Sequence, residues 1–114
     1  DTFGLREAWL RSRKLAQTAA KEASDRCIEY AVAEAAYYAA KAERVMKMKA
    51  DGMQVGIIEM TVKGEPDVNP KLMEKIAAEG RYRAAMKAIE VYKDDARMVY
   101  DEYKRSMMGD PDGY

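Results

Sequence analysis

The fold is decided by one uninterrupted stretch, residues 5–50, which reads LREAWLRSRKLAQTAAKEASDRCIEYAVAEAAYYAAKAERVMKMKA. It contains neither glycine nor proline, and it consists mostly of Ala, Leu, Arg, Lys, Glu and Met, which are strong helix formers. Thr2 is a suitable N-cap, and Gly52 suits the left-handed position that follows a helix. The stretch therefore predicts a long helix over residues 3–51.

A second long helix is predicted over residues 69–107. Asn69 and Pro70 give a strong start signal, with Asn at the cap and Pro at the first helical position. Gly80 is the weakest position inside it. Residues 109–114 are expected to form a flexible tail, because they include Gly, Pro and Asp and end the chain. Residues 1–108 then form a single helical domain.

The connection between the two helices, residues 52–68, is longer than most links between helices. Residues 56–62 concentrate β-branched side chains, which favours a strand-like arm. Residues 63–67, KGEPD, have the composition of a turn. Two interpretations remain open: a functional loop or a short β-arm.

Two stripes with heptad spacing predict how the helices pack. The stripe of the later helix consists of Tyr82, Ala85, Ile89, Tyr92, Ala96, Val99 and Tyr103. The stripe of the earlier helix consists of Ile28, Val32, Ala35, Ala39, Ala42 and Met46. Small alanines let the axes of two helices approach closely. The pattern predicts an all-α fold, a long antiparallel helical hairpin with a coiled-coil-like seam.

The N-terminal segment, residues 5–23, leaves two arrangements open. If the first helix is unbroken, this segment extends past the second helix and exposes an apolar stripe that includes Trp9. Such a stripe favours contact with a second chain, so we expect a homo-oligomer, most simply a dimer. If the helix breaks at Ser24, the segment folds back as the third helix of a bundle.

Composition excludes several classes of function. The chain has no histidine, one cysteine (Cys27) and a formal net charge of zero. Catalysis by histidine, an intrachain disulfide and a CxxC metal site are therefore excluded, and we expect no enzyme activity, cofactor or metal. No apolar run is long enough to span a membrane, and no secretory signal is visible. These features, with a lone thiol that we expect to pack inertly, favour a cytoplasmic protein.

Two groups of residues are candidates for binding. The first is a protein-binding surface made of Trp9 and the apolar residues of the connection, Ile57, Ile58, Met60 and Val62. Alternatively, these apolar residues cap the end of the hairpin or pair with the same loop of a second subunit. The second group would contact nucleic acid and consists of Arg6, Arg11, Arg13 and Lys14, around Trp9.

A further basic cluster precedes the connection and consists of Lys41, Arg44, Lys47 and Lys49. A pocket for a small ligand at a subunit interface is a third class of function. It requires a cavity, which sequence cannot reveal.

Residues 61–70, TVKGEPDVNP, followed by residues 79–86, EGRYRAAM, resemble the small uncharacterised helical proteins of bacteriophages and prophages. In that group a Val-Lys-Gly-acid-Pro-like turn precedes a long alanine-rich helix. The resemblance covers about half of the chain and implies no catalytic residue. It implies a phage-type protein that binds a host or phage protein. One form would be an inhibitor of a host defence system, such as an anti-CRISPR protein. The alternative is a nucleic-acid-binding accessory protein of phage recombination or replication.

Overall fold

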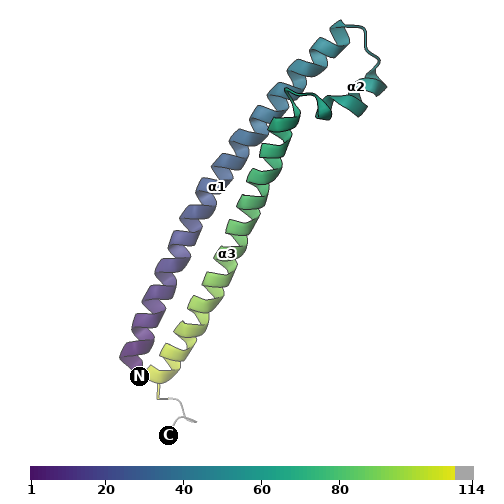
Figure 1. Cartoon of the computed structure of the whole chain (residues 1–114). Helices are drawn as coiled ribbons and strands as arrows, with labels where there is room; N and C mark the ends of the chain where they lie inside the picture. Colours follow the sequence, from purple (N-terminus) through teal and green to yellow (C-terminus); the bar gives the residue numbers. More distant parts are fainter. Residues whose placement is uncertain (110–114) are drawn as a thin grey trace. The chain divides into compact units, whose positions relative to one another are not determined.

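The computed structural model describes residues 1–109, and these residues form helices and turns with no strand among them. The elements are α1 (Thr2–Ala50), α2 (Val55–Thr61), the short 3-10 helix η1 (Val62–Gly64) and α3 (Asn69–Met107) (Figure 1). The prediction of an all-α chain is confirmed. Helices α1 and α3 begin and end within one residue of the predicted ranges, 3–51 and 69–107. Of the tail predicted for residues 109–114, all but Gly109 lies outside the described residues.

Helix α1 is closed at both ends by hydrogen bonds that the sequence supplies locally. At its start the carboxylate of Asp1, not Thr2, accepts the N–H groups of Phe3 and Gly4, at 3.2 and 3.3 Å. At its end Gly52 has a φ of +82°, and its N–H donates to the carbonyl of Lys49 while the N–H of Met53 donates to that of Met48. This is the Schellman arrangement, in which glycine adopts the left-handed conformation without a Cβ clash.

The helix continues through Ser24 without a break, so a fold-back at Ser24 is wrong. Neither glycine nor proline is near to interrupt the backbone hydrogen bonds, and one serine among helix formers costs little.

Contacts divide the chain into two units. One, here called the central unit, is Asp25–Tyr82, and the other, here called the terminal unit, combines Asp1–Ser24 with the chain from Arg83 onward. Each unit contains part of α1 and part of α3. The central unit also contains α2 and η1.

In the central unit, α1 and α3 run antiparallel. The rings of Tyr30 and Tyr82 stack with centroids 6.2 Å apart, and Lys75 Nζ lies 5.8 Å from the ring of Tyr37. Contacts later in α1 are therefore made with residues earlier in α3. The core lies where α2 and η1 cover the end of α1, and it consists of Tyr37, Met48, Ile58, Val62 and Val68, with Val45 and Leu72 packed against it.

The strand-like arm predicted for residues 56–62 is wrong, because these residues form α2 and the start of η1. Ile58 and Val62 are four residues apart, so on a helix they share one face and both reach the core. A lone strand would leave backbone N–H and C=O groups without partners, whereas a helix satisfies most of its own. Packing and backbone hydrogen bonding therefore override the β preference of isoleucine and valine.

In the terminal unit, the start of α1 packs on the end of α3. The ring of Trp9 lies 5.2 Å from that of Tyr100 and 6.3 Å from that of Tyr103. Residues 5–23 therefore have a partner within the chain, and the expectation that an unbroken first helix leaves them without one is wrong. The surplus length of α1 lies at its other end: Arg44 already pairs with Asp67, just before α3 begins, and α2 and η1 cover the residues that follow.

The residues of the stripe expected on the later helix are half-buried, except Tyr92, which is 36% exposed. The stripe predicted for α1 is wrong, because all six of its residues are exposed. The face that α1 buries is a second stripe with identical spacing, here called the inner seam, which consists of Arg26, Tyr30, Ala33, Tyr37, Ala40 and Arg44.

The inner seam can be the buried face because tyrosine and arginine bury the apolar part of their side chains while their polar ends form hydrogen bonds or ion pairs. The hydroxyl of Tyr30 donates to the carboxylates of Glu34 and Glu79, at 3.0 and 3.3 Å. The guanidinium of Arg44 meets Glu65 and Asp67, with Nη2 3.0 Å from Glu65 Oε2.

Candidate functional site

The central unit holds a small pocket between the end of α1 and one face of α2. Its volume is about 350 Å³. The apolar side chains that line it are Val45, Val55, Ile58 and Val62. The charged side chains that line it are Lys41, Lys49, Lys63 and Glu59. We call it the lysine-rimmed pocket, because three lysines line it together with an apolar floor.

The spacing of α1 explains half of this pocket. Lys41, Val45 and Lys49 are each four residues apart, so they follow one another along one face of the helix. Lys41 Nζ also lies 5.9 Å from the ring of Tyr37, which holds the lysine against the core. Two members of the basic cluster noted in the sequence thus belong to the same pocket as two residues of the connection, Ile58 and Val62.

The four connection residues proposed to bind a partner do not share one environment. Ile58 and Val62 are buried, with 3% and 2% exposure, so the expectation that they face solvent is wrong. Ile57 and Met60 are exposed, at 47% and 85%. Because α2 is a helix, Ile57 and Met60 point away from the face that covers the core.

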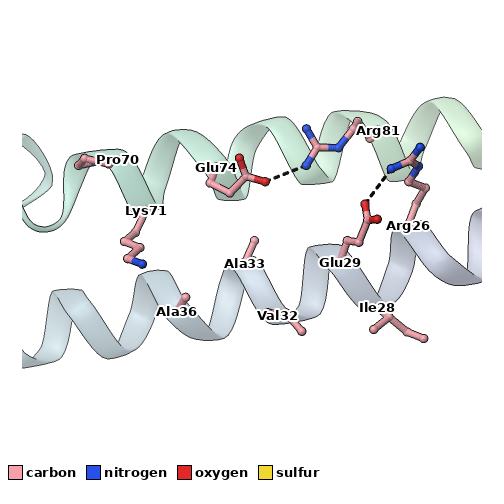
Figure 2. Close-up of a pocket in the computed structure, with 10 residues that line it drawn as sticks. All are labelled: Arg26, Ile28, Glu29, Val32, Ala33, Ala36, Pro70, Lys71, Glu74 and Arg81. Carbon is pink, nitrogen blue, oxygen red and sulfur yellow. Dashed lines mark hydrogen bonds and ion pairs between the residues drawn. The ribbon is translucent and has the colours of Figure 1, made fainter.

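A larger groove runs between α1 and α3 on another side of the central unit, with a volume of about 840 Å³. Figure 2 shows two ion pairs along it, Arg26 with Glu29 on α1 and Arg81 with Glu74 on α3, at 2.9 and 2.8 Å. The remaining lining residues are Ile28, Val32, Ala33, Ala36, Pro70 and Lys71. The small alanine side chains leave the space. Four of the five charged lining residues form these two ion pairs, and Lys71 is the fifth.

The exposed stripe of α1 forms a third surface, here called the outer seam: Ile28, Val32, Ala35, Ala39, Ala42 and Met46. Ile28, Val32 and Met46 are 61%, 64% and 72% exposed. In Figure 2, Ile28 and Val32 point away from α3 whereas Ala33 points toward it. The outer seam is offset from the inner seam by two residues, or about 200° around the helix, so its centre faces away from α3. Two of its residues, Ile28 and Val32, also line the groove between α1 and α3.

Trp9, the remaining candidate for protein binding, lies in the terminal unit and is half-buried. With Ala96, Arg97 and Tyr100 it lines a shallow pocket of about 350 Å³. The guanidinium carbon of Arg13 lies 5.8 Å from the centre of the Trp9 ring, a cation–π distance.

The candidates for nucleic-acid contact, Arg6, Arg11, Arg13 and Lys14, are all exposed. Arg6 and Arg13 are seven residues apart and share a face, whereas Arg11 and Lys14 lie on a neighbouring one. The structure therefore does not gather the four into a single compact patch.

In the central unit the hydroxyl of Tyr30 has a raised pKa. Its hydrogen bond to Glu34, partial burial and the negative charges of Glu34 and Glu79 raise the pKa of the hydroxyl to about 12. The hydroxyl therefore stays protonated and acts as a donor between two carboxylates. This arrangement is structural, because it ties α1 to α3 and offers no base near neutral pH.

Among the described residues, no group of three or more His, Cys, Asp and Glu side chains is placed to hold a metal ion. Cys27 is exposed, so the expectation that it packs on the core side of its helix is wrong. It follows Arg26 of the inner seam by one residue, which turns it about 100° away from that seam. Within residues 1–109 no helix has both the length and the apolar character needed to cross a bilayer.

Comparison of the chain with protein families, curated proteins and solved structures finds no match to any of them.

Proposed function

We propose that this chain is a non-catalytic protein-binding module that holds an acidic, apolar segment of a partner protein in the lysine-rimmed pocket. The observation that carries this proposal is the combination of an apolar floor with Lys41, Lys49 and Lys63 around it. The floor favours the burial of one or two aliphatic or aromatic side chains, and the rim favours neighbouring carboxylates. Glu59 is the single carboxylate that lines the pocket.

The surrounding architecture supports this role. In the proposed arrangement α1 and α3 form one long helical hairpin with a coiled-coil-like seam, and α2 closes its end. Antiparallel contacts in each of the two units support the hairpin. Ile57 and Met60 add an exposed apolar surface on the other side of α2. A partner can therefore contact α2 on two sides.

A binding assay with synthetic peptides tests the pocket. The probes are two fluorescent helical peptides with the same leucines, one with glutamates and one with lysines at the flanking positions. We expect the acidic peptide to bind, and Lys49→Glu with Lys63→Glu to lower its affinity about tenfold or more. Lys93→Glu, on exposed α3 surface, is the matched control and should leave binding unchanged. Equal binding of both peptides, or binding of neither, contradicts the proposal.

The resemblance to phage proteins gives the module a concrete form, an inhibitor that blocks a host defence complex in the cytoplasm of the host cell. The test is to express the chain in bacteria with an active CRISPR or other defence system and to count plaques of a targeted phage. Inhibition requires that plaque numbers rise with the intact chain and fall again with the Lys49→Glu/Lys63→Glu variant. Unchanged plaque numbers across the defence systems argue against this form while leaving the peptide assay to judge the pocket.

Nucleic-acid binding is the second candidate, because Arg6, Arg11, Arg13 and Lys14 are all exposed and Arg13 stacks on Trp9. Exposed cations beside an aromatic ring are typical of surfaces that contact phosphates and bases. A DNA-binding titration separates the candidates: affinity should fall steeply with added salt and disappear in the Arg11→Glu/Lys14→Glu variant. Absence of binding at low salt removes this candidate.

A further inference from the structure

We infer that the outer seam of α1 binds a second copy of this chain, with the two α1 helices side by side and antiparallel. This inference does not depend on the lysine-rimmed pocket, which involves other residues. It starts from the two opposite faces of α1 in the central unit, which carry apolar or amphipathic residues at the same heptad spacing. The inner seam packs within the chain, while every residue of the outer seam is exposed. A helix with two such faces can pack against a different helix on each side.

The outer seam is self-complementary when it is read in opposite directions. Its spacings are +4, +3, +4, +3 and +4, which is the same sequence from either end. In the antiparallel register centred on residue 37, Ile28 meets Met46 of the second copy and Val32 meets its Ala42. Ala35 then meets Ala39 at the centre. Large side chains therefore interlock at both ends, and alanines allow close approach of the axes in the middle, as a two-fold interface requires.

The same register matches charges along one edge of the seam. Asp25 and Glu29 lie on the edge that also carries Lys47, near opposite ends of the seam. A two-fold axis places like edges together, so Lys47 of the second copy falls between Asp25 and Glu29, and the contact occurs twice. Glu43 lies on this edge too and falls within two residues of Glu29 of the second copy, a like-charge contact. Lys47, four residues after Glu43 on the same helix, offsets this repulsion.

The length and exposure of the seam fit a helix pair. From Ile28 to Met46 the seam extends about 27 Å along the helix, roughly five turns. Ile28, Val32 and Met46 are all more than half exposed in the single chain, so association removes apolar surface that folding leaves in water. The opposite edge of the seam carries Ala31 and the exposed ring of Tyr38, which add contact area, and Lys75 Nζ lies 5.9 Å from that ring.

The first test is the molecular mass in solution, measured by light scattering and sedimentation equilibrium. We expect a mass of about twice the 12.9 kDa of the chain. Ala39→Glu places a charge at the alanine centre and should raise the dissociation constant about 100-fold. Ala77→Glu is the matched control, because it makes the same change at an exposed position of α3. Circular dichroism checks that both variants stay helical.

The second test fixes the orientation by disulfide formation in a Cys27→Ser background. Chains with Ala35→Cys and chains with Ala39→Cys are oxidised separately and as a mixture. An antiparallel pair predicts that the mixture cross-links between unlike chains much faster than either chain cross-links to itself. A parallel pair predicts the reverse.

Four results overturn the inference. They are a mass that stays at 12.9 kDa at the highest concentration, a dimer that Ala39→Glu does not weaken, a dimer that Ala77→Glu weakens equally, or faster cross-linking between like chains. Absence of the dimer does not bear on peptide binding in the lysine-rimmed pocket, so the two proposals are tested separately.

Discussion

The central and terminal units are built from the same two helices, yet they bury their side chains to different depths. In the terminal unit the described residues that are buried are Ala19 and Ala23, at 9% and 4% exposure. In the central unit the buried set includes Tyr37, Met48, Ile58, Val62 and Val68. The difference is α2 with η1. Two helices can only half-cover each other's side chains, whereas a third element laid across them removes the remaining contact with water.

The comparison is tested most strongly by two neighbouring isoleucines of α2. Ile58→Ala leaves a cavity among Tyr37, Met48 and Val62 and should lower the free energy of unfolding of the central unit by about 2–5 kcal/mol. Ile57→Ala, at the exposed neighbour, should cost under about 1 kcal/mol. Chemical denaturation measures both changes. Similar losses in the two variants would show that α2 does not cover a core.

In the terminal unit the largest side chain in the interface is Trp9, which is only half-buried. Trp9→Ala removes two aromatic contacts and should cost about 2 kcal/mol, less than full burial would imply. Hydrogen exchange should show the loss of protection in residues 1–24 and 83–109 before residues 25–82. Phe3→Ala, at an exposed position, is the control. Equal loss of protection in both units would mean that they unfold as one.

The ion pairs should also contribute more to the stability of the central unit than to that of the terminal unit. Arg44 of the central unit is half-buried and meets both Glu65 and Asp67, although Nε is not aligned for a hydrogen bond to Asp67. Arg44→Gln should cost about 1 kcal/mol or slightly more. Arg97→Gln in the terminal unit breaks an exposed pair with Asp94 and should cost at most a few tenths, ~0.3 kcal/mol. Thermal unfolding of the two variants compares them.

The last comparison concerns Tyr30, whose pKa is raised from the ordinary value near 10 to about 12. The folded chain holds this proton more tightly than the unfolded chain. The resulting stability is therefore fully present below pH 10 and is lost as the pH rises toward 12. Tyrosinate absorbance should show one tyrosine that titrates late in the intact chain and is missing from Tyr30→Phe. A late titration that persists in Tyr30→Phe, or that is absent from the intact chain, would contradict the contact with Glu34 and Glu79.

The sequence was sufficient to predict the long helices, because helix propensity, Gly52 and the Asn69–Pro70 start act locally. It was not sufficient to choose between the two faces of α1. Both faces have heptad spacing, and the outer one holds the aliphatic residues Ile28, Val32 and Met46. The face that is buried instead holds Tyr30 and Arg44, whose polar tips need partners that only the folded chain provides.

The candidate site was predicted in part for a similar reason. The sequence identifies the connection as apolar, but it leaves open a loop or a β-arm, and solvent-facing residues or residues that cap the end of the hairpin. The +4 spacing of Ile58 and Val62 was the available signal for a helix with one buried face. The +4 spacings from Lys41 through Val45 to Lys49 could likewise have indicated one side of a pocket. What sequence alone cannot supply is the packing of α2 on α1, which depends on tertiary contacts.

The hydrogen bonds of the chain also differ in how much sequence they must bring together. Arg44 and Glu65 are 21 residues apart and Tyr30 and Glu79 are 49 apart, whereas Thr2 and Ser106 are separated by 104. Closing a short loop costs less entropy and takes less time than closing a long one. The central unit should therefore nucleate folding, and it is fully synthesised before the C-terminal half of α3 leaves the ribosome. The terminal unit would then fold last, after the contacts of the central unit have formed.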